Sequence, residues 1–173
     1  MTRTVAVLCL ALCTILSVSS SIAADPSTAI GKRAIGFTME DQYEKEWSWD
    51  DHWRGKPTII MMTDRKGKDF LQNWIKPLVD TFRTQVRFAS FADVSTVPGF
   101  LKGFIRGKFR EAFTWSILMD WDGMVMEHYK AKPDVPNILF VDSNGIVRLH
   151  TWGDGTGASV TMFIDHVQRH LQP

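Results

Sequence analysis

The chain has 173 residues, with 20 lysines and arginines against 19 acidic residues and a formal net charge of +1 at pH 7. This balance argues against a nucleic-acid-binding protein, which would carry a basic excess. Only 2 residues are cysteines, so stability has to come from packing, for which 7 tryptophans and 11 phenylalanines are available.

Residues 1–24 have the three-part pattern of a secretory signal peptide. A cationic start at Arg3 precedes an apolar run over 5–16, and small residues then lead to an abrupt change at Asp25. The run is too short to cross a bilayer, which needs about 20 apolar residues. We therefore predict cleavage after Ala23 or Ala24 and export of the mature chain, either to a periplasm or as a secreted protein.

Both cysteines, Cys9 and Cys13, lie inside this signal segment. Lipid attachment to Cys13 is disfavoured, because Leu12 stands where a lipoprotein signal has a small residue. Cleavage would leave a mature chain with no cysteine. Such a chain has no thiolate for redox chemistry.

Behind the signal segment we expect a flexible lead-in over 25–33 and one domain over 34–173. Short apolar or alternating runs predict strands, at 34–39, 58–62, 86–91, 116–119, 137–141 and 146–152. Apolar residues spaced by three and four predict helices, at 70–82, 100–113, from 125 onward and at 160–171. Pro77 should kink or break the first of these helices. The order predicts an α/β fold in which helices cover both faces of a mixed sheet.

Two segments resemble the redoxin branch of the thioredoxin-like superfamily, which includes peroxiredoxins and exported thiol-disulfide reductases. The first, GFTMEDQYEKEWSWDDHWRGKPTIIMM, is similar to the opening of that branch, with a β-hairpin and Gly-Lys-Pro before the central strand. The second, VPNILFVDSNG from Val135, is similar to a signature with a cis proline, a strand and an Asp-x-x-Gly turn. The resemblance covers about residues 34–171 and implies a thioredoxin-like three-layer α/β/α fold with a mixed central sheet.

The resemblance also implies a Cys-x-x-Cys pair where the central strand enters its helix. One count along the sequence places the pair near Gly67 and Phe70, and another places it near Asp69 and Gln72. Neither window contains a cysteine. The chemistry of the family cannot be carried over, because disulfide exchange and peroxide reduction both need a thiolate.

The loop at this position is charged, and its five candidate binding residues are Asp64, Arg65, Lys66, Lys68 and Asp69. Open α/β sheets bind ligands at the carboxyl ends of their strands, and the alternative is a solvated charged loop. In relatives the proline at the place of Pro136 lies beside the redox pair and its backbone holds an extended peptide. Val135 and Pro136 are therefore candidates for peptide binding by strand addition, or for simply shaping the chain before the strand.

Three further features have two interpretations each. His166 and His170 share a helix face and are weak candidates for a zinc or copper site, but no third ligand is evident in the sequence. Trp47, Trp49 and Trp53 cover the core or form an exposed surface for a partner or a sugar, and the alternation of Trp47 and Trp49, which places both on one face of a strand, favours the core. Residues 102–110 are basic and aromatic and form an ordinary surface helix or contact a membrane surface or an acidic partner.

The sequence therefore predicts an exported thioredoxin-like protein without thiol chemistry, whose leading function is non-catalytic binding of a protein or peptide. We expect no cofactor, no nucleic acid and no transmembrane segment in the mature chain. One alternative is an enzyme with acid–base groups in the loop 63–69, although no paired carboxylates or nucleophile–base pair support it. The other is weak metal handling through His166 and His170.

Overall fold

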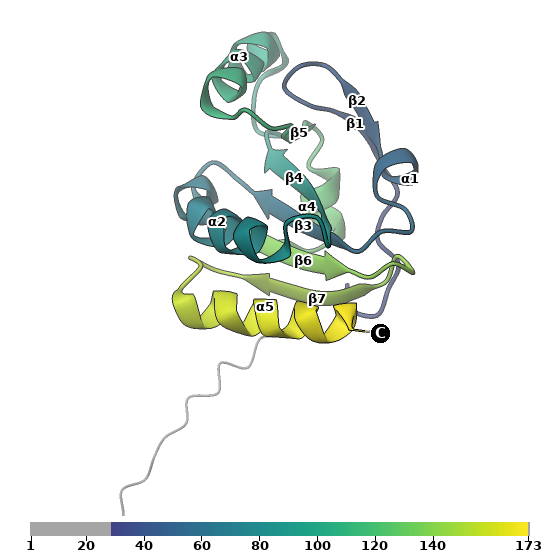
Figure 1. Cartoon of the computed structure of the whole chain (residues 1–173). Coiled ribbons are helices and arrows are strands. Elements are labelled where there is room, and N and C mark those ends of the chain that lie inside the picture. The colour runs from purple at the N-terminus through teal and green to yellow at the C-terminus, as the bar shows by residue number, and fades with distance from the viewer. Residues whose placement is uncertain (1–28, 173) are drawn as a thin grey trace, which may run out of the picture.

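The computed structural model describes residues 29–172, so the predicted signal segment lies outside the described residues. A five-stranded sheet organises this range, in the order β5–β4–β3–β6–β7 (Figure 1). Its strands are β3 (Thr58–Thr63), β4 (Arg87–Asp93), β5 (Leu118–Asp120), β6 (Asn137–Val141) and β7 (Val147–Trp152). β3, β4 and β5 run parallel, whereas β6 and β7 are antiparallel to their neighbours. The predicted mixed sheet is confirmed.

The central strand β3 is buried along its whole length. Ile59 and Met61 belong to the core on one face of the sheet, and Ile60 and Met62 belong to the core on the other. A strand covered on both faces needs apolar side chains at every position. This explains why the run appears in the sequence as continuous rather than alternating.

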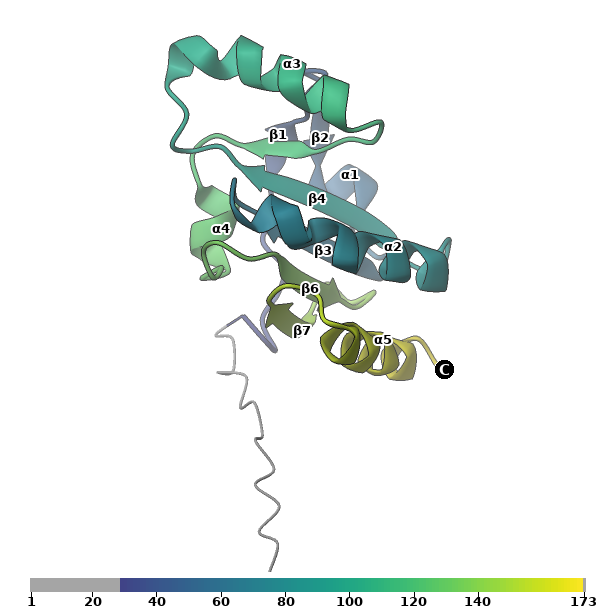
Figure 2. The same ribbon diagram turned by 90° about the vertical axis from the view of Figure 1, so that its left-hand side faces the viewer.

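The helices α2 (Leu71–Phe82), α3 (Lys102–Ala112) and α5 (Gly157–Leu171) lie on one face of the sheet (Figure 2). A short 3-10 helix, η2 (Gly99–Leu101), leads into α3. The connections through α2 and α3 cross the sheet in the same direction, from β3 to β4 and from β4 to β5. Since such crossovers are right-handed, both helices fall on the same side.

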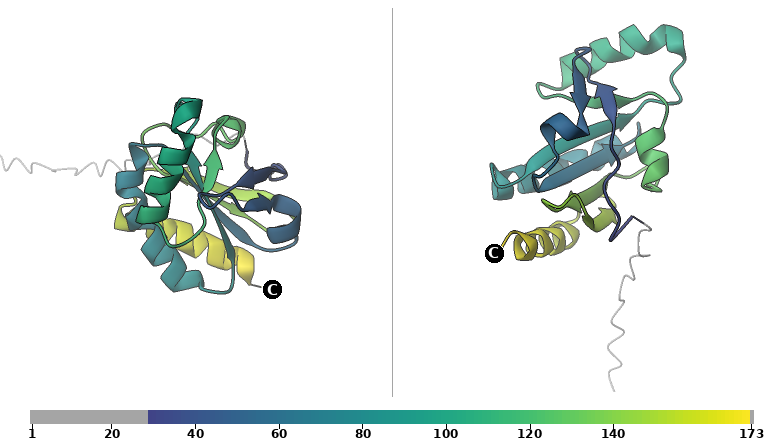
Figure 3. Two further views of the ribbon diagram at one scale, coloured as in Figure 1. Left: turned by 90° about the horizontal axis from the view of Figure 1, so that it is seen from above. Right: turned by 90° about the vertical axis from the view of Figure 1, so that its right-hand side faces the viewer.

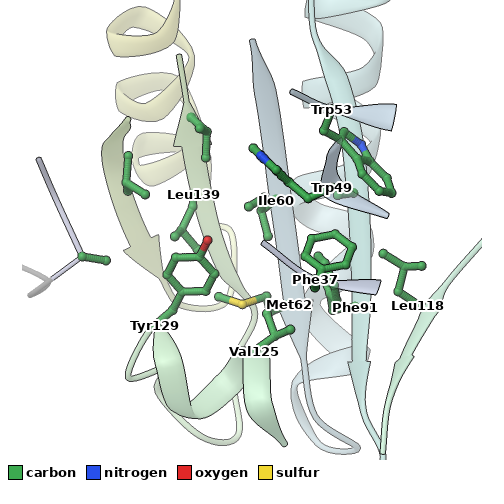
Figure 4. Close-up of a cluster of buried hydrophobic side chains, with 14 residues drawn as sticks. Phe37, Trp49, Trp53, Ile60, Met62, Phe91, Leu118, Val125, Tyr129 and Leu139 are labelled. Atoms are coloured by element: carbon green, nitrogen blue, oxygen red, sulfur yellow. The ribbon is translucent and has the colours of Figure 1, made fainter. Parts of the chain in front are cut away.

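The opposite face is covered by a β-hairpin and two short helices, which Figure 3 shows in front of the sheet in its right-hand view. They are β1 (Thr38–Glu40), β2 (Glu46–Ser48), α1 (Trp49–His52) and α4 (Met124–His128). Trp49 of α1 and Val125 of α4 pack with side chains of the sheet and of the connecting segments in the cluster drawn in Figure 4. At its centre the ring of Phe37 lies 5.5 Å from that of Trp53 and 5.0 Å from that of Phe91, centroid to centroid.

The expected core role is confirmed for Trp49 and Trp53, which are buried, while Trp47 is partly buried. The prediction that Trp47 and Trp49 share a strand face is wrong. β2 ends at Ser48, whose hydroxyl accepts a hydrogen bond from the Asp51 N–H at 3.2 Å and so caps α1. Trp49 is therefore the first residue of a helix.

Of the two outcomes predicted at Pro77, a kink or a break, the break is wrong, because α2 continues through this proline to Phe82. Buried residues on both sides, Trp74 before it and Leu78 after it, anchor the helix to the sheet. The indole N–H of Trp74 also donates to the Gly153 carbonyl at 2.9 Å. These tertiary contacts offset the lost helical hydrogen bond. Within residues 29–172 no helix is long and apolar enough to span a membrane.

His150 is a buried titratable group in β7, only 6% exposed. Burial, and to a smaller extent the charge of Lys132, lowers its pKa from 6.5 to about 4. The folded state therefore holds a neutral imidazole that the unfolded chain protonates below about pH 6.5. This contribution to stability is complete above pH 6.5 and is lost as the pH falls toward 4.

We predict that between pH 6.5 and pH 4 the free energy of unfolding falls by roughly 2 kcal/mol less in His150→Gln than in the wild type. Urea titrations at several pH values measure this difference. His128→Gln, at an exposed position, is the matched control and should keep the wild-type slope. A His150→Gln profile parallel to that of wild type would contradict the prediction.

Candidate functional site

The carboxylate of Asp64 organises the loop that follows β3. Its Oδ1 accepts the N–H groups of Lys66 at 3.0 Å and Gly67 at 2.8 Å, and its Oδ2 accepts the N–H of Asp134 at 2.7 Å. The loop then passes into the 3-10 helix η1 (Gly67–Phe70) and α2. One side chain therefore shapes the start of η1 and ties it to the segment that precedes β6.

Gly67 packs directly against Val135. A Cβ atom on Gly67 would lie 2.7 Å from the carbonyl carbon of Val135 and would also collide with the hydroxyl of Thr63. The structure thus brings together the two segments that the sequence singled out, the charged loop and Val135-Pro136. Only a residue without a side chain allows this approach.

A second link between the two segments joins Lys66 to Asp134. The Lys66 Nζ lies 2.9 Å from Asp134 Oδ2, and both side chains are exposed. The hydrogen bond to Asp134, reinforced by the charge of that carboxylate, raises the pKa of Lys66. A lysine held in its charged form is a poor general base, so this contact favours a structural role.

The expected cis proline is not found, because no peptide bond among residues 29–172 is cis. The buried side chain of Asn137 turns the chain instead. Its Oδ1 accepts the Lys132 N–H at 2.8 Å, and its Nδ2 donates to the carbonyls of Lys132 at 2.8 Å and Val135 at 3.0 Å. With Asp134 at a φ of 66°, this turn leads into β6 through a trans Val135–Pro136 bond. The Asn137 amide thus occupies one of the two acceptor positions of the Val135 carbonyl oxygen.

The other candidates of the loop point outward. Arg65, Lys68 and Asp69 are exposed, and Phe70 beside them is 40% exposed. Lys68 Nζ lies 3.9 Å from a carboxylate oxygen of Asp69, which is a weak contact at the surface. Within the described range Arg65 has no ion pair. The loop therefore presents a cationic and aromatic outer surface.

Sequence reasoning missed Asp134 and Phe70. The Pro133-Asp134 pair is a turn signal, but nothing in the sequence indicates that its N–H reaches Asp64, 70 residues earlier. The sequence places Phe70 at one end of the absent redox pair and at the start of a predicted helix. Its exposure depends on how η1 joins α2, which no local pattern predicts.

The two C-terminal histidines do lie together on α5, with ring centroids 5.7 Å apart. Burial, followed by the charges of Arg169 and His170, lowers the pKa of His166. In the described part of the chain no group of three or more His, Cys, Asp or Glu side chains is placed to hold a metal ion. A pair alone does not make a zinc or copper site.

The hollow nearest the loop lies on its α3 side. It has a volume of about 410 Å³ and its lining includes Asp64, Arg65 and Lys68, whereas Val135 and Pro136 are not part of the lining. A groove beside Pro136 would have favoured a peptide held next to the proline. The hollow lies between the loop and α3 instead.

Neither a protein-family model nor a curated protein matches the sequence. Solved structures do match. A putative thiol:disulfide interchange protein DsbE from Chlorobium tepidum has a TM-score of 0.63 at 16% identity, over 83% of this chain and 98% of that one. A putative protein disulfide isomerase from Bacteroides thetaiotaomicron has a TM-score of 0.62 at 16% identity, over 83% and 91%. The chain has a thioredoxin-like fold.

A secreted disulfide oxidoreductase of Mycobacterium tuberculosis also matches, with a TM-score of 0.53 at 16% identity over 77% of this chain and 95% of that one. At such identities the likeness concerns the fold alone. It confirms the thioredoxin-like architecture of the kind found in redoxin-type thiol-disulfide oxidoreductases. The site in this chain has to be interpreted from its own residues.

We predict that Gly67→Ala lowers the free energy of unfolding by about 1–3 kcal/mol, because the new methyl group overpacks the contact between Thr63 and Val135. Gly103→Ala is the matched control. It lies inside α3 with open space around its Cβ position, so it should raise stability by up to about 1 kcal/mol. Chemical denaturation measures both. Equal effects of the two substitutions would refute the close contact.

Proposed function

We propose that the mature chain is an exported thioredoxin-fold protein that binds a protein partner without reacting with it. The observation that supports this most is the contact of Gly67 with Val135. The β3 loop and the segment before β6 meet here, and the residue at the meeting point is a glycine. The backbone arrangement of a thioredoxin-like site is present, but the predicted mature chain has no cysteine to act as its nucleophile.

Thiol chemistry has no candidate residue. The only cysteines in the sequence are Cys9 and Cys13, both in the predicted signal segment. Acid–base chemistry in the loop is also poorly supported. Both oxygens of Asp64 accept backbone N–H groups, and Lys66 is paired with Asp134. These groups hold the loop in place, which favours recognition over catalysis.

The binding surface that we propose is the outer side of the loop, with Arg65, Lys68 and Phe70. Arginine and aromatic side chains contribute most of the energy at many protein interfaces. The loop is fixed from within by Asp64, so little conformational entropy is lost when a partner docks. The chemistry of this surface suits a partner with acidic groups around an apolar pocket.

We predict that the mature chain, residues 25–173, reduces neither insulin disulfides nor hydrogen peroxide above the buffer background. The reason is that both reactions need a thiolate. A thioredoxin assayed in parallel provides the positive control. Turnover that scales with the concentration of the chain would show that a different residue acts as nucleophile.

Partner binding can be tested by a photo-crosslinking amino acid placed at Phe70 in the full chain, expressed in its own host. The control is the same amino acid at Met162, which is 64% exposed on α5 and lies away from the loop. We expect a discrete adduct from position 70 and none from position 162. Equal labelling at both positions, or no adduct at either, would contradict the proposed surface.

A further inference from the structure

Two adjoining hollows lie on the sheet beside α2. One is bounded by α2 and α3, between which Figure 2 shows β4, and the other by α2 and the segment 115–118. One, of about 410 Å³, adjoins the Asp64 loop, and the other, of about 630 Å³, lies toward the end of α2. Both are lined by Met61 and Ser90, so we treat them as one trough. α2 lines it from Leu71 to Asp80, which corresponds to about 14 Å along the helix axis.

Two features form the trough. The β4 side chains that face it include small ones, and ion pairs hold α3 against the β1–β2 hairpin rather than against the sheet. Ser90 and Ala92 are the small side chains of β4 that line it. The Arg106 side chain of α3 pairs with Glu44 at 2.8 Å and with Glu40, both from the β1–β2 hairpin. These ion pairs anchor α3 to the hairpin. Ile105 of α3 is left only partly buried and lines the trough.

The lining suits a hydrocarbon chain better than a peptide. The backbone groups of the floor pair in the ladder between β3 and β4 and, from Phe91 to Asp93, in the ladder between β4 and β5, so an extended peptide would find no strand partners over the loop half of the trough. Each unpaired buried polar group costs about 1–3 kcal/mol. The hydroxyl of Ser90, whose residue is 8% exposed, is the one polar side chain that both hollows share. A hydrocarbon chain has no polar groups that need pairing.

Cationic side chains stand at the loop end of the trough. Arg65 and Lys68 both line it. Arg65 has no ion pair among the described residues, and Lys68 has only the 3.9 Å surface contact with Asp69. Two carboxylates line the same end, and three of their four oxygens accept other hydrogen bonds. Asp64 is taken by the three N–H groups of its loop, and Asp93 Oδ1 accepts the N–H and hydroxyl of Ser95 at 3.0 and 2.6 Å. The two cations therefore remain available for an anion.

We propose that the trough binds an anionic single-chain amphiphile, such as a long-chain carboxylate. Its carboxylate lies between Arg65 and Lys68, and its chain runs over Met61 and Ser90 to the tryptophan-lined far end, where Trp53 and Trp115 are found. This site goes beyond the proposed recognition of a protein partner and does not depend on it. Volumes of this order are typical of small-molecule sites lined mainly by apolar side chains.

The test uses the mature chain and three probes with the same alkyl chain: dodecanoate, dodecanol and dodecylamine. Displacement of a dansyl-labelled fatty acid measures their affinities. We expect saturable binding of dodecanoate at one site, roughly tenfold tighter than that of the neutral or cationic probe. Replacing Arg65 and Lys68 together by alanine should weaken dodecanoate about five- to tenfold and leave dodecanol unchanged. Arg169→Ala, at an exposed position of α5, is the control and should change neither.

Two substitutions of Ser90 separate a hydrocarbon chain from a peptide. Ser90→Ala should leave dodecanoate binding unchanged or tighten it several-fold, because the chain covers a hydroxyl it cannot bond. Ser90→Phe should abolish binding by filling the trough, with thermal unfolding as the check of its fold. If Ser90→Phe does not fold, the exposed Arg65 and Lys68 substitutions still decide the question.

Several results would overturn the proposal. These are equal affinities for the three probes, loss of binding in Ser90→Ala, retained binding in a folded Ser90→Phe variant, or tight binding only of an amphipathic helical peptide. Adduct formation from position 70 should be unaffected by Ser90→Phe. A failure of the amphiphile site is thereby distinguished from a failure of the partner surface.

Discussion

The carboxylate of Asp64 is the interaction on which the rest of the site depends. It accepts three backbone N–H groups, two from its own loop and one from Asp134. Charge-assisted hydrogen bonds of this kind are stronger than neutral ones. They hold the loop after β3 against the segment before β6, and the contact of Gly67 with Val135 follows from that position. The loop is consequently fixed by hydrogen bonds between one side chain and three backbone N–H groups.

The loop after β3 thus has the backbone arrangement of a thioredoxin-like site without a cysteine at that position. The strand, the loop and the following helix are placed as the fold requires, but glycine stands at the point of closest contact. The side chains that could have acted as acid or base are used to hold the loop. What remains accessible is its outer surface and the trough on its α3 side. Both surfaces are suited to binding. Arg65 and Lys68 belong to the outer surface of the loop and also line the trough.

Much of the fold follows from local patterns in the sequence. Continuous apolar runs predicted β3 and β6, because these strands are buried on both faces. The trans bond at Pro136 could not be predicted, since it depends on the three hydrogen bonds of Asn137. The trough was missed for a similar reason. It depends on ion pairs of Arg106 with residues more than 60 positions away, and no spacing rule indicates such pairs.

The central claim is that the working protein has a thioredoxin-like fold and no thiol. The most direct test is the intact mass of the protein recovered from its exporting cells, measured before and after treatment with a maleimide under denaturing conditions. The account predicts a chain that begins at Ala24 or Asp25 and gains no mass from the reagent. A chain that retains Cys9 and Cys13 and takes up the maleimide would contradict it.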